Sequence, residues 1–525
     1  MLMSGGDYRE SLRRYRPCVF LNGRRVESVV DEALLAPGVN AIALTYDYAL
    51  REGLAPLMRV NDVNRMLAIP RSSDDLLNKL EAVRLLCQET GCAQRYLAAD
   101  AFSALVTTAI EVDAERGTEY SARVQAYVAR AQHEDLAIGI AMTDGKGDRS
   151  DRPHGQDNPD AYVRIAGRRP DGLLLRGVKA IITGAPYMHE LLVMPCRNMT
   201  ELDADYAVCA AVPIDAPGLT LVTRPAGRPG EPAAAFSSRY GQSTAVAMFD
   251  DVFVPWERVF LAGEWPYSAK LTYTYATHHR HTCIAARAGF GDLLIGAGAL
   301  MTEANGIDLD GAGNLRECMT DLIRIVEGFV ACGVAASVYC EIDRAGTAAP
   351  DAVFANIGKL LMATQIYDMH RLAHHVSGGL IVTLPGPEED HNPATGGRIS
   401  ELLAGRSDIP YEKRIAVARL IEDLTASSQG GWYSVISLHG GGSPEAMKME
   451  IWRRYPLGNK VDLVERLLER GVLADRIRGI TRNRQPGRCC VNGCVVPLPE
   501  GTGESRPRSS VPARAGSGVA PGSAR

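Results

Sequence analysis

The sequence predicts an α+β protein in which a strand-rich centre lies between two helical regions. The chain has 525 residues and is 46% hydrophobic, which is enough for a large buried core and roughly two or three domains. Apolar residues recur at helical spacing before and after the centre. The centre consists of short β-branched runs separated by Gly, Pro and Asp.

The N-terminal region, residues 1–140, is predicted to be a helical domain. Ser73 supplies a helix-capping side chain, and the apolar residues from Leu76 to Leu86 recur at helical spacing. Helix-forming residues continue from Ala101 to Ala131. These patterns predict that helices fill most of this region.

Residues 141–268 are predicted to form a central antiparallel β-domain. Several short strands at this density favour a closed or sandwiched antiparallel unit. The predicted strands are Tyr162–Ile165, Leu173–Arg176, Leu191–Met194, Tyr206–Val212, Leu219–Val222 and Ala245–Val254.

Residues 269–480 are predicted to form a C-terminal helical bundle. Long apolar-periodic segments surround Gly289–Thr302, Leu322–Tyr339 and Ala355–Val376. Residues 481–525 are rich in Arg, Pro, Gly and Ser. Because such a segment buries too little apolar surface to fold, it is predicted to be a disordered tail.

The composition argues against several classes of protein. A net charge of −5 does not favour a nucleic-acid partner, and no uninterrupted apolar stretch approaches the roughly 18 residues of a membrane span. The N-terminus lacks the features of a signal peptide. Most of the twelve cysteines stand singly in apolar runs, which indicates reduced thiols and a cytoplasmic location. Cys489, Cys490 and Cys494 lack a fourth zinc ligand nearby.

One turn-forming segment, Ala141–Arg149, has the chemistry of a cofactor-binding loop. Its Gly and Asp residues favour a turn with free backbone N–H groups, and Lys146 or Arg149 supplies a cation. These groups suit the ring edge or the pyrophosphate of a flavin. An ordinary Asx turn between a helix and a strand is the alternative interpretation.

Cys92 and Tyr96 are the first candidates for the reactive centre. Their i, i+4 spacing predicts that the two side chains share one helix face and reach the same bound molecule.

Ordered motifs over nearly the whole chain carry a family resemblance. Besides Ala141–Arg149 they are Val178–Ala185, Phe249–Pro255, Gly291–Ala297, Ser377–Pro385 and Leu438–Pro444. In order and spacing they resemble the superfamily of 4-hydroxyphenylacetate 3-monooxygenases and 4-hydroxybutyryl-CoA dehydratases over residues 1–480. The resemblance implies an acyl-CoA dehydrogenase-like fold with an N-terminal helical domain, a central antiparallel β-domain and a C-terminal helical bundle.

The resemblance also implies FAD as the cofactor. Thr183 would donate a hydrogen bond to the flavin, and the glycine-rich loop after His439 would close over it. The implied flavin-binding residues are Met142, Thr143, Lys146, Gly147, Asp148, Arg149, Thr183, His439, Gly440, Gly441, Gly442 and Ser443.

The iron–sulfur cluster of the dehydratases is not expected here. In that family three cysteines and one histidine hold the cluster, and the resemblance places Cys92 and His279 at two of these positions. Tyr96 and Ala286 stand at the other two. Two ligands cannot hold a cubane cluster with useful affinity, so no metal site is expected.

The catalytic side chains of the dehydratases are also largely replaced. Two glutamates of that family correspond to positions in Gly241–Thr244 and to Ile436, a tyrosine corresponds to Cys283, and a lysine corresponds to Arg287. The loss of these groups argues against dehydration.

The hydroxylase features are partly present. Tyr96 stands at that family's tyrosine over the substrate, whereas Cys92 and Ile140 replace its arginine and histidine. A roomier, less anion-selective pocket is therefore expected. Tyr96, His279 and Cys92 are the predicted catalytic residues.

We therefore predict a two-component FAD-dependent monooxygenase that hydroxylates an aromatic or other electron-rich small molecule. The resemblance implies that a separate flavin reductase supplies reduced FAD and that the chain forms a homotetramer. A cluster-free enzyme resembling 4-hydroxybutyryl-CoA dehydratase/vinylacetyl-CoA isomerase is the main alternative. A non-catalytic flavin-binding or scaffold subunit is a third possibility.

Overall fold

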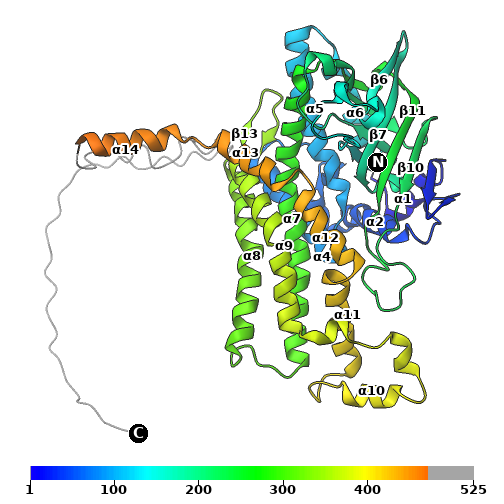
Figure 1. The fold of residues 1–525 in the computed structure, drawn as a ribbon, viewed down its shortest axis with the longest axis vertical. Helices are drawn as coiled ribbons and strands as arrows, with labels where there is room; N and C mark the ends of the chain where they lie inside the picture. Colours follow the sequence, from blue (N-terminus) through cyan, green and yellow to red (C-terminus); the bar gives the residue numbers. More distant parts are fainter. Residues whose placement is uncertain (1, 471–525) are drawn as a thin grey trace. The chain divides into compact units, whose positions relative to one another are not determined.

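The computed structural model describes residues 2–470 and confirms the predicted fold class (Figure 1). Helices come first, two β-sheets follow, and a helical bundle completes the chain. The predicted disordered tail, residues 481–525, and the Cys489, Cys490 and Cys494 group lie outside the described residues.

The N-terminal region contains most of the predicted helices and a few short strands. Ser72, and not Ser73 as predicted, caps the fourth helix by accepting a hydrogen bond from the Asp75 backbone N–H at 3.1 Å. Gly91, with φ of 66°, ends that helix. The helices are α1 (Gly5–Leu12), α2 (Ala36–Leu50), α3 (Ala55–Met58), α4 (Ser73–Thr90), α5 (Leu97–Arg116) and α6 (Tyr120–His133).

The central region forms two sheets. The larger sheet has the order β2-β1-β10-β11-β7-β6, and the smaller has the order β12-β9-β8-β5. Most pairings are antiparallel as predicted, but β1 is parallel to β10 and β5 is parallel to β8. The strands are β1 (Cys18–Leu21), β2 (Arg24–Arg25), β5 (Ile138–Ala141), β6 (Arg164–Arg169), β7 (Gly172–Thr183), β8 (Glu190–Val193), β9 (Val208–Pro213), β10 (Leu219–Thr223), β11 (Thr244–Pro255) and β12 (Val259–Ala262).

Strand β1 joins the central sheet although it belongs to the region that was predicted to be helical. Val19 and Leu21 are buried while Phe20 between them is exposed, which is the two-residue alternation of a half-buried strand. Four residues are too few for periodicity to reveal this strand in the sequence. The exact domain boundaries stay predictions.

The C-terminal bundle is built around α7, α8 and α9, which Figure 1 shows side by side. Helix α7 is long and apolar enough to cross a membrane by length and composition, but 61% of its apolar window is buried inside the chain, as in a core helix. The helices are α7 (Pro266–Ala304), α8 (Gly313–Val338), α9 (Ala352–Ser377), α10 (Gly396–Leu402), α11 (Tyr411–Thr425), α12 (Ser428–His439), α13 (Pro444–Arg454) and α14 (Gly458–Arg470).

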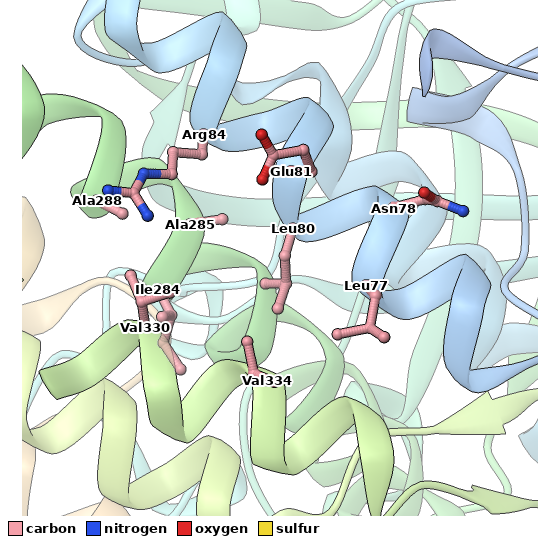
Figure 2. A pocket seen from close by; sticks show the side chains of 10 residues that line it. All are labelled: Leu77, Asn78, Leu80, Glu81, Arg84, Ile284, Ala285, Ala288, Val330 and Val334. Atoms are coloured by element: carbon pink, nitrogen blue, oxygen red, sulfur yellow. The ribbon is translucent and has the colours of Figure 1, made fainter. Parts of the chain in front are cut away.

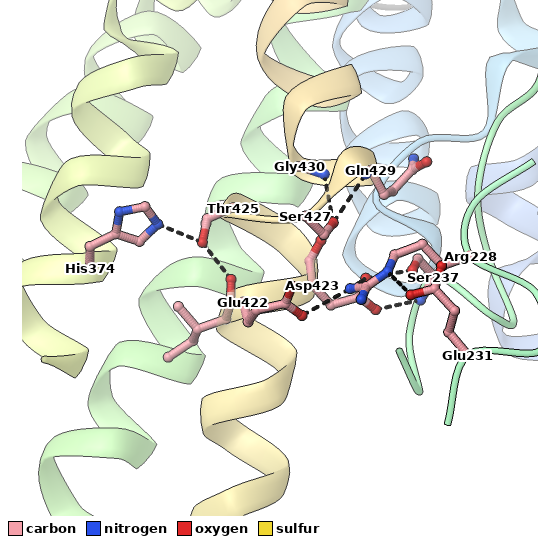
Figure 3. A network of polar contacts seen from close by, with 11 residues as sticks. Arg228, Glu231, Ser237, His374, Glu422, Asp423, Thr425, Ser427, Gln429 and Gly430 are labelled. Atoms are coloured by element: carbon pink, nitrogen blue, oxygen red, sulfur yellow. Dashed lines mark hydrogen bonds and ion pairs between the residues drawn. The ribbon is translucent and has the colours of Figure 1, made fainter. Parts of the chain in front are cut away.

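A polar network ties the loop between β10 and β11 to the bundle (Figure 3). Buried Asp423 of α11 accepts hydrogen bonds from the Ser237 backbone N–H at 2.8 Å and from Arg228 Nη1 at 3.1 Å. Ser427, just after α11, caps α12 by accepting from the Gln429 and Gly430 backbone N–H groups. The network therefore holds the loop, residues 224–243, against the start of α12.

Candidate functional site

Cys92 and Tyr96 are both buried, each 1% exposed, in the connection between α4 and α5. The prediction that they share one helix face is wrong. Gly91 ends α4 with a positive φ, and Gln94–Tyr96 forms a separate short 3-10 turn, η3. A Cβ atom on Gly91 would lie 2.3 Å from the Tyr433 hydroxyl. Glycine is therefore needed here both for backbone conformation and for packing.

His279 of α7 lies between two tyrosine rings. Its imidazole stacks with the ring of Tyr275 at a centroid distance of 5.5 Å and with the ring of Tyr96 at 6.5 Å. The Cys283 Sγ atom, one turn further along α7, lies 3.3 Å from His279 Nε2. The structure thus brings together Tyr96 and His279, two of the three predicted catalytic residues.

A buried ion pair lies behind His279. Lys79 Nζ of α4 is 2.5 Å from Asp100 Oδ1 of α5, and the Thr282 hydroxyl donates to the same oxygen at 2.9 Å. Asp100 Oδ2 lies 3.7 Å from His279 Nδ1, which is an ion-pair distance but longer than a hydrogen bond. Burial raises the pKa of Asp100, but Lys79 and His279 outweigh it and lower the pKa to about 2.

The His279 and Cys283 side chains stabilise each other's charged forms. Burial lowers the pKa of His279, but the Cys283 thiolate and Asp100 outweigh this effect and raise it to about 9. Burial raises the pKa of Cys283, but His279 outweighs it and lowers the pKa overall. The contact therefore favours the imidazolium form of His279 and the thiolate form of Cys283. The i, i+4 spacing of His279 and Cys283 was a sequence signal for this contact.

Cys92 lies near this cluster and interacts with Arg287 of α7 and with Gln242 of the β10–β11 loop. Burial raises the pKa of the Cys92 thiol, and the nearby Arg287 guanidinium opposes that rise. The backbone carbonyl of Cys92 accepts a hydrogen bond from Gln242 Nε2 at 2.8 Å. Arg287 and Gln242 were not among the predicted site residues.

The first half of the predicted flavin-binding loop is fixed to β7. Buried Lys179 forms an ion pair with Asp144 Oδ1 at 2.7 Å and donates to the Met142 carbonyl at 2.9 Å. The Thr143 carbonyl accepts from the Ala180 backbone N–H at 2.8 Å. Met142 and Thr143 are half-buried.

The second half of the loop turns toward solvent. Lys146 and Gly147 have positive φ values of 73° and 49°, and a Cβ on Gly147 would lie 2.0 Å from Gln156 Oε1. Asp148 and Arg149 are exposed, whereas Lys146 is half-buried. The role of these residues toward a flavin stays a prediction.

Thr183 ends β7 beside a strained residue. It pairs with Thr244 of β11. Ile181 adopts a φ of 59° and leaves its side chain 61% exposed. A β-branched residue in the left-handed region is strained, and such strain tends to occur at ligand sites.

The glycine-rich loop after α12 lies against His279. Arg280 Nε donates to the Gly441 carbonyl at 2.8 Å, and a Cβ on Gly441 would lie 3.1 Å from His279 Cδ2. Gly441 and Gly442 have φ values of 77° and 106°. His439 is exposed, so the structure does not bring its side chain to the His279 cluster.

The rest of the loop supports the following helix. Ser443 caps α13 by accepting a hydrogen bond from the Ala446 backbone N–H at 3.3 Å, and Gly440 ends α12. Both residues are half-buried.

A separate cavity of about 280 Å³ lies between α4, α7 and α8 (Figure 2). Its floor is apolar, with Ile284, Val330 and Val334, whereas Glu81 and Arg84 of α4 line its polar side. No predicted catalytic residue lines this cavity.

Comparison with known proteins identifies one family over nearly all of the described chain. Residues 4–261 match the model of the 4-hydroxyphenylacetate 3-hydroxylase N terminal part, and residues 268–469 match that of the 4-hydroxyphenylacetate 3-hydroxylase C terminal part.

Relatives of two activities resemble the whole chain. The 4-hydroxybutyryl-CoA dehydratase/vinylacetyl-CoA-Delta-isomerase of Clostridium aminobutyricum is 33% identical over 487 residues, covering 89% of this chain and 99% of the relative. The 4-hydroxyphenylacetate 3-monooxygenase oxygenase component of Thermus thermophilus is 26% identical over 479 residues, covering 89% and 97%. A solved structure of the oxygen-tolerant archaeal 4-hydroxybutyryl-CoA dehydratase from N. maritimus has a TM-score of 0.85 at 34% identity, covering 93% and 97%.

The relatives are enzymes, and they differ in the reaction that their names describe. Since both halves of the family match in order along one chain, the protein belongs to the 4-hydroxyphenylacetate 3-hydroxylase family.

Proposed function

We propose that the protein is the oxygenase component of a two-component FAD-dependent monooxygenase, with an aromatic or other electron-rich small molecule as substrate. The observation that carries this proposal is the buried cluster of Tyr96, His279 and Cys283, closed on one side by Gly441. Buried, mutually polarised acid–base groups are typical of a reactive centre.

The residues present fit a flavin. Lys179 and the Ala180 backbone N–H fix Met142 and Thr143 to β7. The turn at Lys146 and Gly147 follows at the surface, and Ile181, two residues before the predicted flavin donor Thr183, is strained. When bound, reduced FAD would supply the electrons that activate oxygen.

The residues present do not fit the iron–sulfur cluster of the dehydratases. Tyr96 and Ala286 supply no thiolate. Within residues 2–470, no group of three or more His, Cys, Asp or Glu side chains is arranged to hold a metal ion. An iron–sulfur cluster therefore has no part in the proposed reaction.

Tyr96 and His279 are proposed to orient the substrate and to move a proton. Burial raises the pKa of Tyr96 well above its ordinary value, so its hydroxyl stays protonated and donates a hydrogen bond to a substrate oxygen. His279, with a pKa of about 9, is a cation at neutral pH and donates a proton from its imidazolium. The buried surroundings of both groups exclude water.

Oxygen uptake tests this function. The protein, a flavin reductase, NADH and FAD are mixed with a panel of substituted phenols, and oxygen use, hydrogen peroxide and hydroxylated products are measured. We expect at least one phenol to give a hydroxylated product that requires this chain. Oxygen use that yields only peroxide with every phenol argues against the proposed substrate class.

A cluster-free CoA-thioester isomerase or dehydratase is the second candidate. It is favoured by the 33% and 34% identity to two dehydratases over nearly their full lengths. Turnover of vinylacetyl-CoA or 4-hydroxybutyryl-CoA without oxygen would support it and would contradict the monooxygenase proposal. A flavin reductase partner, a homotetramer and a cytoplasmic location belong to the first proposal.

A further inference from the structure

Three buried cations gather on the side of α7 that faces α9 and α12. Arg280, Arg287 and Lys359 are 3%, 4% and 0% exposed. Arg280, Cys283 and Arg287 follow the i, i+3, i+7 pattern, which places them on one face of α7, and Lys359 comes from α9.

These cations are held by neutral groups. Arg287 Nε donates to the Ser437 hydroxyl at 2.5 Å, and Lys359 Nζ donates to the Ser437 carbonyl at 2.6 Å. Arg280 donates to the Gly441 carbonyl and to Asn356 Oδ1. Arg287 Nη1 is buried and has no hydrogen-bond partner within residues 2–470.

The local charge is not balanced by carboxylates. Within residues 2–470, no Asp or Glu oxygen lies within the 4.0 Å ion-pair distance of the three cations. Glu450, which attracts Arg280 from farther away, is paired with Arg453 at 3.0 Å and with Arg454 at 3.6 Å. The nearby acidic group is the Cys283 thiol, and its charged form is also stabilised by His279.

An unpaired buried cation is energetically unfavourable. Burial lowers the pKa of Lys359 to about 8 and lowers the pKa of Arg280. Burial also opposes the charge of Arg287, but the acidic groups around it, Cys92 first, outweigh burial and raise its pKa. Arg287 and Lys359 are nevertheless buried beside each other, and one guanidinium N–H group of Arg287 is unused. This arrangement suits an anion that comes from outside the chain.

We propose that Arg287 and Lys359 form a buried binding site for an anionic oxygen group of the substrate, a carboxylate or a phenolate. The planar guanidinium of Arg287 matches such a group, and Lys359 adds a point charge. Arg287 interacts electrostatically with Cys92, Tyr96 and Cys283, so the bound anion lies next to the predicted catalytic groups. This inference rests on the proposed function and specifies its substrate class as small organic anions.

Ser437 accepts hydrogen bonds from both Arg287 and Lys359. These two contacts fix the distance between the cations.

Thermal unfolding with benzoate as the probe tests the site. Benzoate should raise the melting temperature of the wild-type protein by about 2 °C or more at saturation, whereas neutral benzyl alcohol should not. In R287Q and K359M the benzoate shift should fall to less than half. The exposed-cation variant R371Q, on α9, should keep the full shift. Equal shifts in all four proteins would overturn the proposal.

The melting temperatures without benzoate provide a second test. Removing an uncompensated buried cation should leave the melting temperature of K359M equal to or above that of the wild type. A marked decrease, together with an unchanged benzoate shift, would show that Lys359 is only structural and would overturn the proposal.

The anionic form of reduced flavin is the competing ligand for the same cations. Its dissociation constant is measured anaerobically by fluorescence for wild type and R287Q. R287Q could lose tenfold or more in affinity for reduced FAD but not for oxidised FAD, while benzoate leaves the melting temperature of the wild type unchanged. This result would assign the site to the cofactor and overturn the substrate assignment. A benzoate shift that persists in a protein that neither binds FAD nor uses oxygen would refute the proposed function but not the anion site.

Discussion

Replacement of Lys79 by Met should destabilise the protein strongly. Lys79 and Asp100 are 2% and 0% exposed, and their charged atoms are 2.5 Å apart. Without Lys79 the Asp100 carboxylate stays buried next to Thr282 and His279 with one cation fewer. Loss of one partner of such a pair costs about 3–5 kcal/mol.

The Asp100 pKa gives an independent magnitude. Lowering of this pKa from 3.8 to about 2 corresponds to about 2 kcal/mol of stability. Because the folded pKa lies below the unfolded one, this contribution is present above pH 3.8 and is lost as pH falls through about 2. A cost of about 2–5 kcal/mol for K79M at pH 7 is therefore expected.

Urea unfolding at pH 7 measures this cost. The double variant K79M/D100N should recover most of the loss, since Asn keeps an oxygen for Thr282 and removes the orphaned charge. R324M, which breaks the exposed ion pair with Asp321, should cost less than about 1 kcal/mol. A K79M cost no larger than that of R324M, or a double variant less stable than K79M, would refute this reasoning.

The remaining predictions concern the reactive centre and the assembly. Tyr96→Phe should leave folding and FAD affinity nearly unchanged. Product formation should fall by roughly ten- to a thousand-fold, and more of the consumed oxygen should appear as hydrogen peroxide. An unchanged ratio of product to peroxide would contradict a catalytic role of the hydroxyl. Because the pKa of His279 is raised from 6.5 to about 9, its contribution to stability should be fully present below pH 6.5 and should be lost as pH rises through about 9. C283S removes the thiol whose anionic form raises the pKa of His279, so it should weaken this loss in urea unfolding between about pH 6 and 9, and identical profiles would speak against the ion pair. Anaerobically purified protein should lack stoichiometric iron and acid-labile sulfide, and about four irons per chain would restore the dehydratase interpretation. Sedimentation should show a homotetramer, and a monomer at micromolar concentration would exclude it.

The sequence was sufficient for the order of the domains and for most strands. Long periodic segments such as Leu322–Tyr339 and alternating runs such as Ala245–Val254 correspond closely to α8 and β11, because extended burial of one face leaves a clear period. Strands β1, β5 and β12 were not predicted. They have four residues each, and their partners are distant in the sequence.

The reactive centre was only partly predictable. The i, i+4 spacing of Cys92 and Tyr96 suggested a helix, but Gly91 interrupts it through a packing contact with Tyr433 that is far away in the sequence. Asp100 and Lys79 reach His279 only after α4, α5 and α7 have packed together. Local patterns contain no information about such contacts, so these residues could not be selected from the sequence.

Isotope labelling distinguishes oxygen insertion from oxygen-independent turnover. Protein loaded anaerobically with chemically reduced FAD is mixed with ¹⁸O₂ and a small anionic phenol, such as a hydroxybenzoate, and the product is analysed by mass spectrometry. The account predicts a hydroxylated product that contains one ¹⁸O atom and that is strongly reduced in the Tyr96→Phe protein. Absence of labelled product across a panel of such phenols, together with oxygen-independent turnover of 4-hydroxybutyryl-CoA or vinylacetyl-CoA, would contradict it.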